Sequence, residues 1–426
     1  MRAEDRFGNA IDPGVGFARG RVLGSSADEV RRLRHAQAVA ARIVAERGPE
    51  AIAIFTGNPR FCPLRAEDLA THCEEWVGPG LFAEALRRAA VAHLGGEAGD
   101  AAAVLNRTSA GIVAAMLALS AGRAVLSVVP EGDRSHASVV RGCRLAGVAL
   151  VEVAAGDADG IARALEAHRP ALMVVTTVTS TLARIADAAA RAAVDAGRAA
   201  GATVFLDEAY GARLRPVLHG GAASLALGAD LAITNADKAG LSGPRAGVLA
   251  GRPGPVVAVL ARASELGMEA RAPVAAGALR SLEGWDPEDL RAEARDGAAV
   301  ADAVAVRLGE DIVTRSDLGP SIGEEDVMAR LLARSGANRA AIVPAEATAA
   351  VGMLLLERCG VLTVNTHGQP GGRVSIRLKP VAGAVARAGG AEALAAALEA
   401  AMEEVAAHLD DPAWTARRLF GAEAAA

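Results

Sequence analysis

The stretch VFLDEAYG, residues 204–211, joins a short apolar run to the acidic Asp207 and to Tyr210, the only tyrosine of the chain. A second apolar run, at 231–234, is followed closely by Lys238. Short runs of this kind are typical of strands buried in a sheet. In an open α/β sheet, ligands bind at the carboxyl ends of the strands. We therefore expect Asp207 and Lys238 to meet in one crevice at that edge of the sheet.

The scarcity of lysine makes Lys238 a candidate for catalysis. Of the 45 basic residues only two, Lys238 and Lys379, are lysines. A surface that needs positive charge can use arginine, but chemistry that needs a neutral amine cannot, because guanidinium stays protonated in proteins. A bias of the genome towards arginine explains why the chain has few lysines, but it does not explain where the two lysines lie. Taken singly, Lys238 would be a solvated loop residue and Asp207 a helix cap; together they indicate a catalytic pair.

Between about residues 100 and 250, apolar runs alternate with alanine-rich amphipathic stretches. The expected strands are 124–129, 149–153, 171–177, 203–206, 231–234 and 246–250. The expected helices between them are 110–120, 138–146, 161–168 and 185–199. This alternation predicts an α/β fold with a mainly parallel sheet.

The chain divides into three parts. We predict an N-terminal arm and helix at 1–60, a large domain at 61–275, and a connecting helix with a smaller C-terminal α+β domain at 276–426. The helices expected outside the alternating region are 27–46, 81–94, 287–308 and 390–408. The strands expected in the C-terminal domain are 341–343, 353–357, 362–364 and 374–378, with a loop at 368–372.

Composition argues against several classes of protein. A net charge of −5 and 3% aromatic residues disfavour a general binder of nucleic acid. Four cysteines without CxxC spacing suit reduced thiols better than disulfides or zinc, so no metal site is expected. Apolar segments are interrupted well short of a membrane span, and the N-terminus carries charges instead of an apolar leader. We expect a cytoplasmic protein that does not enter a membrane.

A carboxylate and a lysine that converge at strand ends suggest pyridoxal 5′-phosphate as cofactor. The carboxylate keeps the pyridine nitrogen protonated, so that the ring is an effective electron sink, and the lysine forms a Schiff base. The segment NRTSAG, residues 106–111, precedes a predicted helix, where backbone N–H groups and the hydroxyls of Thr108 and Ser109 suit the phosphate, with Ala110 beside them. Serine and threonine at this position are also ordinary helix caps.

Two further side chains are candidates for the cofactor. His136, in SHAS at 135–138, follows a predicted strand and is placed to lie flat on a pyridine ring. The alternative for His136 is a partly exposed polar residue at a helix start. Arg245, shortly after Lys238, adds a cation for the phosphate or is a surface arginine.

These motifs resemble known families. The segment 207–211 with Lys238 resembles the core of fold-type-I pyridoxal-phosphate enzymes, the aspartate aminotransferase superfamily. The segment 133–147 is similar to the ring-stacking histidine region of the oxoamine synthases. The segment 237–247 looks more like bacterial selenocysteine synthase, the L-seryl-tRNA(Sec) selenium transferase. The layout as a whole, including FTGN at 55–58, resembles a selenocysteine-synthase-like group.

The resemblance implies a large seven-stranded-type domain sandwiched by helices, followed by a smaller domain. It implies that Lys238 binds the cofactor covalently, that Asp207 faces the pyridine nitrogen and that His136 stacks on the ring. It also implies phosphate contacts from Thr108, Ser109 and Arg245. Oxoamine synthases usually have histidine where Tyr210 stands, which leaves the partner of the cofactor's phenolic oxygen open. A homodimer or higher homo-oligomer is implied, and the chain offers no obvious surface for tRNA.

The reaction is predicted less closely than the cofactor. Arg377 lies on a late strand where the superfamily typically carries the arginine that binds the substrate carboxylate, although it could be a surface arginine. Asn58 and Arg60 are further candidates for contact with a small amino-acid substrate. The selenocysteine-synthase-like layout favours elimination or replacement at Cβ, and transamination, aldol cleavage and racemisation stay open. A different class, an RNA-associated or non-catalytic binding protein on an enzyme fold, is the alternative.

Overall fold

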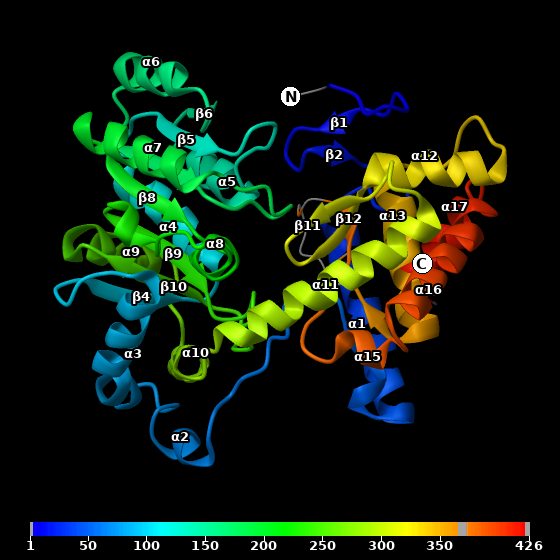
Figure 1. Ribbon diagram of the computed structural model, residues 1–426, viewed down its shortest axis with the longest axis horizontal. Coiled ribbons are helices and arrows are strands. Elements are labelled where there is room, and N and C mark those ends of the chain that lie inside the picture. Colours follow the sequence, from blue (N-terminus) through cyan, green and yellow to red (C-terminus); the bar gives the residue numbers. More distant parts are fainter. Residues whose placement is uncertain (1–2, 365–371, 373, 422–426) are drawn as a thin grey trace. The chain divides into compact units, whose positions relative to one another are not determined.

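The computed structural model describes residues 3–364, 372 and 374–421. The chain forms two compact units, Pro59–Arg291 and Met1–Asn58 with Ala292–Ala426. The N-terminal segment therefore groups with the C-terminal one. The division at 1–60, 61–275 and 276–426 stays a prediction; its boundary at residue 275 falls inside a helix, α10. Figure 1 gives the element labels used below.

A seven-stranded sheet forms the centre of the unit Pro59–Arg291. The strands lie in the order β4-β10-β9-β8-β7-β5-β6, in which β10 is antiparallel to both neighbours and the other pairs are parallel. Their bounds are β4 Ala101–Leu105, β5 Val125–Val129, β6 Leu150–Ala154, β7 Leu172–Thr176, β8 Thr203–Asp207, β9 Leu231–Asn235 and β10 Gly247–Gly251. The six predicted strands are confirmed to within one residue at each end. Strand β4 was not predicted, because three alanines with low strand propensity make up most of it.

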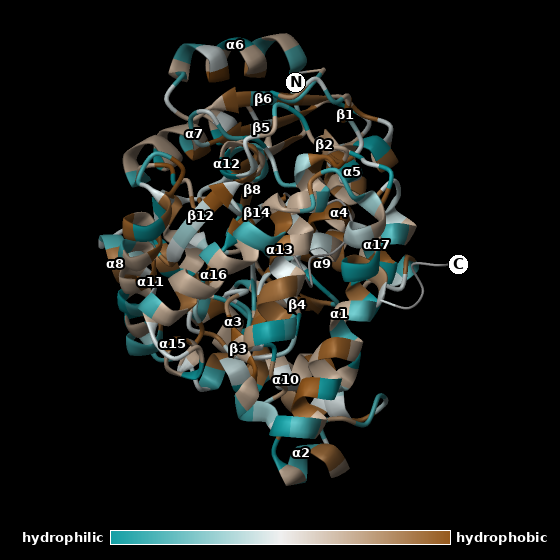
Figure 2. Cartoon of the chain, turned by 90° about the vertical axis from the view of Figure 1, so that its right-hand side faces the viewer, coloured by the Kyte–Doolittle hydropathy of each residue, from teal (hydrophilic) through white to brown (hydrophobic). Residues whose placement is uncertain are grey.

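Helices cover both faces of this sheet (Figure 1). One face packs against α6 and α7, and the other against α4, α5 and α9. Successive residues of a strand point to opposite faces, so Phe205 joins the second core while Val204 and Leu206 join the first. Both faces are apolar in consequence, and β5 is drawn in hydrophobic brown in Figure 2. The helices of this unit are α2 Ala66–Ala70, α3 Gly78–Leu94, α4 Thr108–Leu119, α5 Ala137–Ala146, α6 Ala158–His168, α7 Asp187–Ala199, α8 Gly211–His219, η2 Leu225–Leu227, α9 Pro253–Glu265 and α10 Ala272–Glu283.

The other unit contains small sheets and long helices. Its strands are β1 Ile11–Asp12, β2 Phe17–Ala18, β3 Ala53–Ile54, β11 Thr314–Ser316, β12 Gly319–Gly323, β13 Val361–Leu362 and β14 Ser375–Arg377. Its helices are α1 Ser26–Arg47, η1 Pro49–Ala51, α12 Glu324–Ser335, α13 Pro344–Cys359, α15 Ala384–Arg387, α16 Ala391–Ala406 and α17 Pro412–Phe420. The helix α11, Pro287–Leu308, begins in the first unit and ends in this one. No helix in the described part of the chain combines the length and the apolar character that crossing a membrane requires.

Two predicted strands of this unit are wrong. Residues 353–357 belong to α13, and 341–343 form no strand. Every residue of α13 from Pro344 to Leu356 is buried, so the helix has no polar face. Periodicity cannot distinguish such a fully buried helix from a buried strand. The predicted loop at 368–372 lies, except for Gly372, outside the described residues.

A buried carboxylate ties the N-terminal segment to α13. Glu346 is fully buried in the first turn of that helix. Its Oε1 accepts hydrogen bonds from the backbone N–H groups of Val22 at 2.6 Å and Leu23 at 2.8 Å. Its Oε2 accepts one from the N–H of Val343 at 3.0 Å. The Glu346 carboxylate thus accepts hydrogen bonds from three buried N–H groups that would otherwise have no acceptor, because water does not reach them.

Replacing Glu346 with alanine is expected to lower the free energy of unfolding by about 3–5 kcal/mol, because several buried N–H groups lose their acceptor together. Denaturant titration followed by circular dichroism measures the change. Glu403→Ala is the matched control, since Glu403 is largely exposed and pairs with Arg334 at the surface; it should cost less than about 1 kcal/mol. Similar losses in both variants would contradict this role for Glu346.

Candidate active site

Asp207 and Lys238 follow neighbouring strands of the central sheet. Strands β8 and β9 run parallel, with Asp207 opposite Ile233. Asp207 is the last residue of β8, and Lys238 comes shortly after Asn235, the last residue of β9. Both therefore lie at the carboxyl edge of the sheet, where we expected them.

Asp207 is almost fully buried at 4% exposure. Burial raises the pKa of its carboxyl group to about 6, because a charged carboxylate is disfavoured away from water. The charge of Lys238 opposes this rise, and the charge of Glu208 adds to it. A cationic partner in direct contact with the buried Asp207 would therefore strongly stabilise its charged carboxylate.

Lys238 has an amine that loses its proton more readily than an ordinary lysine. Burial lowers its pKa to about 8; the charges of Asp237 and Asp207 oppose the shift, whereas those of Arg60 and Arg245 add to it. The Nζ atom lies 5.1 Å from the centre of the Tyr210 ring. A lysine tuned in this way supplies the neutral amine that nucleophilic chemistry needs.

Arginines surround this lysine. The Nε atom of Arg60 lies 3.0 Å from Oδ2 of the buried Asp237. Burial, together with the charges of Arg60 and Arg107, lowers the pKa of Arg245 to about 10. Burial and the charge of Arg60 also lower the pKa of Arg107. Guanidinium groups close enough to shift one another make a site suited to a phosphate or carboxylate.

Arg60 was predicted to belong to the N-terminal arm, yet it lies in the unit Pro59–Arg291. The N–H of Phe61 donates to the carbonyl oxygen of Ser242 at 2.9 Å, which holds this segment against the loop that follows Lys238. Arg107 was not among the predicted site residues. Its position directly before Thr108 in NRTSAG is the signal that could have found it.

The N-terminus of α4 reaches the same edge of the sheet. Its N-cap is Arg107, whose side chain has no oxygen to cap the helix. The Thr108 hydroxyl donates to the carbonyl oxygen of Thr234 at 3.3 Å. A Cβ added at Gly247 would lie 2.8 Å from the Thr108 nitrogen, so glycine permits this close approach. The positive end of a helix dipole favours an anion here.

The other predicted phosphate contacts lie in the first turn of α4. The hydroxyl of Ser109 accepts a hydrogen bond from that of Ser138 at 3.2 Å, which brings the N-termini of α4 and α5 together. The N–H of Ala110 donates to the carbonyl oxygen of Arg107 at 3.0 Å. That bond uses the Ala110 donor within the turn itself.

His136 is the N-cap of α5. Its Nδ1 accepts a hydrogen bond from the N–H of Ser138 at 3.2 Å and contacts the Ser138 hydroxyl. The residue is exposed at this helix start. The Ser138 hydroxyl thus connects His136 to Ser109, and the stacking of His136 on a ring stays a prediction.

The remaining substrate candidates belong to the other unit. Asn58 is buried, and its side-chain amide donates to the carbonyl oxygen of Gly57 at 3.0 Å. Arg377 lies on β14 at the edge of a three-stranded sheet, opposite Ser321 of β12. It is 7% exposed, so the alternative of a surface arginine is wrong. Contact of either residue with a substrate stays a prediction.

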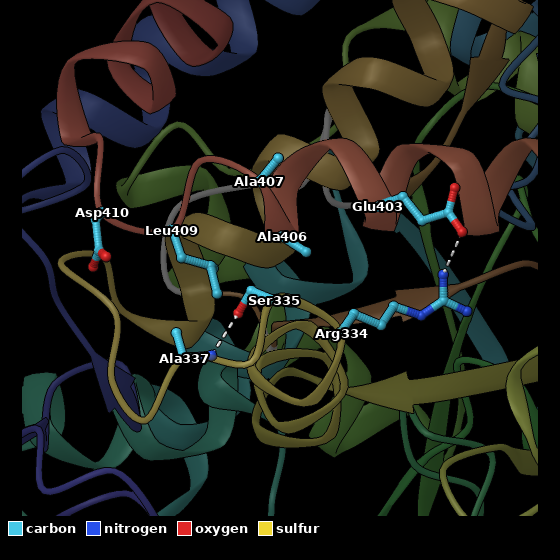
Figure 3. A pocket seen from close by; sticks show the side chains of 8 residues that line it. All are labelled: Arg334, Ser335, Ala337, Glu403, Ala406, Ala407, Leu409 and Asp410. Atoms are coloured by element: carbon cyan, nitrogen blue, oxygen red, sulfur yellow. Dashed lines mark hydrogen bonds and ion pairs between the residues drawn. The ribbon is translucent and has the colours of Figure 1, made fainter.

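A separate cavity of about 590 Å³ lies in that unit, between the ends of α12 and α16 (Figure 3). Its lining contains none of the candidate residues. Arg334 points to Glu403 there and also pairs with Glu399, so its charge is already met. In the described part of the chain, no cluster of three or more His, Cys, Asp or Glu side chains is arranged to hold a metal ion.

The residues at the sheet edge fit pyridoxal 5′-phosphate. Asp207 could bind the protonated pyridine nitrogen, Lys238 the aldehyde carbon, and the α4 N-terminus with Arg245 the phosphate. The buried acid, the tuned amine and the close approach at Gly247 each suit a different part of that molecule. The fold and this site define a pyridoxal-phosphate-dependent enzyme of fold type I.

Comparison with known proteins gives the same class. The family model of class I and II aminotransferases matches residues 67–310. A UPF0425 pyridoxal phosphate-dependent protein of Methanothermobacter thermautotrophicus is 32% identical over 361 residues, which cover 84% of this chain and 89% of the relative. The chain belongs to the class I and II aminotransferase family.

Solved structures share the fold. Pyridoxamine-pyruvate aminotransferase of Mesorhizobium loti has a TM-score of 0.54 at 16% identity, over 83% of this chain and 92% of that one. A chain in the complex of SepCysS with the SepCysE N-terminal domain has a TM-score of 0.57 at 13% identity, over 84% and 96%. At these identities the likeness concerns the fold alone.

Proposed function

We propose that this protein binds pyridoxal phosphate covalently through Lys238 and catalyses elimination or replacement at Cβ of a small amino acid. The observation that carries the proposal is the buried Asp207 beside the low-pKa Lys238 at adjacent strand ends. The resemblance of 237–247 to selenocysteine synthase favours the Cβ branch. We propose further that the enzyme is a cytoplasmic homodimer or larger homo-oligomer.

The roles of the residues follow from their chemistry. When bound, pyridoxal phosphate withdraws electron density from the Cα of an amino substrate. Asp207 accepts the hydrogen bond of the protonated ring nitrogen and keeps that proton in place. Lys238, once its nitrogen is released from the cofactor, takes the proton from the substrate Cα as a general base. Arg377, Asn58 and Arg60 are the proposed substrate contacts, with Arg377 binding the carboxylate.

The remaining roles concern the cofactor. His136 stacks on the ring in this proposal, and Tyr210 lies beside the Lys238 amine. Thr108, Ser109 and Arg245 hold the phosphate at the positive end of α4, with Ala110 beside them in the first turn.

Transamination is the second candidate function. The match to the family model of class I and II aminotransferases supports it. That reaction would leave every substituent of the substrate Cβ in place. Aldol cleavage and racemisation need the same lysine and the same buried acid. An RNA-associated or non-catalytic binding protein would need neither, so the tuned pair argues against that class.

The proposed function is tested by reduction and by product analysis. The protein is incubated with pyridoxal phosphate, reduced with borohydride and mapped by peptide mass; an adduct on Lys238 is expected. Serine, cysteine and O-phosphoserine are then supplied, and release of pyruvate and ammonia is expected from elimination. Conversion of the cofactor to its aminated form, with a 2-oxo acid, would establish the aminotransferase branch instead. Absence of the Lys238 adduct would overturn the proposal.

A further inference from the structure

A buried arginine lies behind the catalytic pair. Arg213, in the first turn of α8, is 1% exposed. A guanidinium this deeply buried is rare unless its charge is met by a carboxylate or by several hydrogen bonds. The two terminal nitrogens of Arg213 donate to neutral acceptors on α3, on β9 and in the segment after β8. The proposed function gives this residue no role.

The first set of contacts joins the two strand ends. One terminal nitrogen of Arg213 donates to Oδ1 of Asn235 at 2.8 Å and to the carbonyl oxygen of Ala209 at 3.3 Å. The side-chain amide of Asn235 donates to the same Ala209 oxygen. Ala209 follows Asp207 in the chain and Asn235 precedes Lys238. The three residues therefore connect the segment after β8 to the end of β9.

A hydroxyl strengthens this connection. The other terminal nitrogen of Arg213 donates to Oγ1 of Thr234 at 3.0 Å. That hydroxyl in turn donates to the carbonyl oxygen of Glu208 at 2.9 Å. The segments that follow β8 and β9, beside Asp207 and Lys238, are thus held by one continuous set of hydrogen bonds.

The second set of contacts reaches the turn after Lys238. Nε2 of His93 lies 3.1 Å from Nη1 of Arg213, the terminal nitrogen that also donates to Thr234. Burial and the charge of Arg213 lower the pKa of His93 to about 3, so the imidazole is neutral near pH 7 and Nε2 accepts the bond. The His93 ring meets the edge of Trp285 with 5.6 Å between centroids.

Trp285 then packs against Gly240. A Cβ added at Gly240 would lie 2.6 Å from Cζ3 of Trp285. Gly240 has φ of 82°, and Ala239 before it has φ of 50°. This left-handed turn begins immediately after Lys238 and needs glycine where the indole approaches. The packing of Trp285 therefore fixes the backbone that carries the lysine.

We propose that Arg213, Asn235, His93 and Trp285 form a strand-end clasp that fixes the Lys238 amine relative to the Asp207 carboxylate, with Arg213 as its positioning residue. The idea deepens the proposed function and rests on it for its catalytic meaning. Reacting groups lose efficiency when displaced by about 1 Å. The clasp sets this spacing through hydrogen bonds to the two strand ends.

The clasp makes a measurable difference even without cofactor. If it is loosened, more water reaches the half-buried Lys238, and the pKa of its amine returns towards the value of an ordinary lysine. The charges that shift the Lys238 pKa belong to Asp237, Arg60, Asp207 and Arg245. Replacing the uncharged Asn235 with alanine changes none of these charges. A change in the Lys238 pKa in that variant would therefore come from altered packing and hydrogen bonds.

The test labels the full chain, freed of cofactor, with acetic anhydride over a range of pH. The chain contains two lysines, so peptide mapping assigns the label. Half-maximal labelling of Lys238 is expected near pH 8 in the wild type and higher by about 1 pH unit in Asn235→Ala and Arg213→Met. Arg191→Met is the matched control, because this exposed arginine donates to the carbonyl oxygen of Ala226 away from the strand ends; its midpoint should equal that of the wild type.

A folded Asn235→Ala variant with an unchanged midpoint would overturn the clasp. Circular dichroism checks folding, and Asn235→Ala decides the question if Arg213→Met does not fold. The holoenzyme gives a second readout, in which kcat should fall more than KM rises in the same variants. Failure of the proposed function is recognised separately, by the absence of a reduced adduct on wild-type Lys238, because the labelling experiment needs no cofactor.

Discussion

Replacing Lys238 with alanine is expected to abolish the borohydride-reducible attachment of pyridoxal phosphate and to lower turnover by about 10³-fold or more. The variant loses both the nucleophile that binds the cofactor and the base that takes the substrate proton. Arginine cannot substitute, because it stays protonated. Peptide mapping after reduction, combined with steady-state kinetics, measures both losses.

Lys379→Met is the control for this prediction. Lys379 is 3% exposed, and a Cβ added at Gly57 would lie 3.0 Å from its Cβ. Methionine keeps the aliphatic part of this packed stem, whereas alanine would leave a gap. The adduct on Lys238 and the turnover should both persist in Lys379→Met. Equal losses of the adduct and of turnover in the two variants would show that Lys238 is not the residue that binds the cofactor.

The sequence predicted the sheet and its carboxyl edge because both depend on local pattern. Strands buried on both faces, such as β7 and β8, appear as continuous apolar runs bounded by polar residues. Asp207 and Lys238 then stand out as charged residues directly beyond such runs. The same logic failed for α13, where burial on all sides removed the polar face that marks a helix.

The clasp could not be predicted, because it depends on tertiary contacts. Arg213 is one of 43 arginines, given 45 basic residues of which two are lysines, and nothing near it in the chain marks it as buried. His93 and Trp285 come from distant segments and meet only in the folded unit. The contact of Arg60 with the segment before Lys238 was not predicted for a similar reason: its ion pair with Asp237 joins residues far apart in sequence.

The buried acid is costly to the fold without its partner. The folded pKa of Asp207 is about 6, above the value of about 3.9 in an unfolded chain. The folded state therefore holds the proton more tightly, and the free energy of unfolding falls as the pH rises from about 4 to 6. Above pH 6 the full cost remains, on the order of 3 kcal/mol. Such a cost is typical of a residue kept for function.

Replacing Asp207 with asparagine should therefore stabilise the cofactor-free protein and disable the enzyme. We expect the free energy of unfolding to rise by about 2–3 kcal/mol at pH 8. It should be nearly unchanged near pH 3.5, where the Asp207 carboxyl group is neutral in the folded state and mostly neutral in the unfolded state. Turnover should fall by about 10³-fold while the adduct on Lys238 persists, because ring protonation serves the reaction more than attachment. Denaturant titration at the two pH values and kinetics at pH 8 measure this. The exposed Asp195→Asn is the control and should change neither quantity. Full turnover in Asp207→Asn would show that this carboxylate does not face the ring nitrogen.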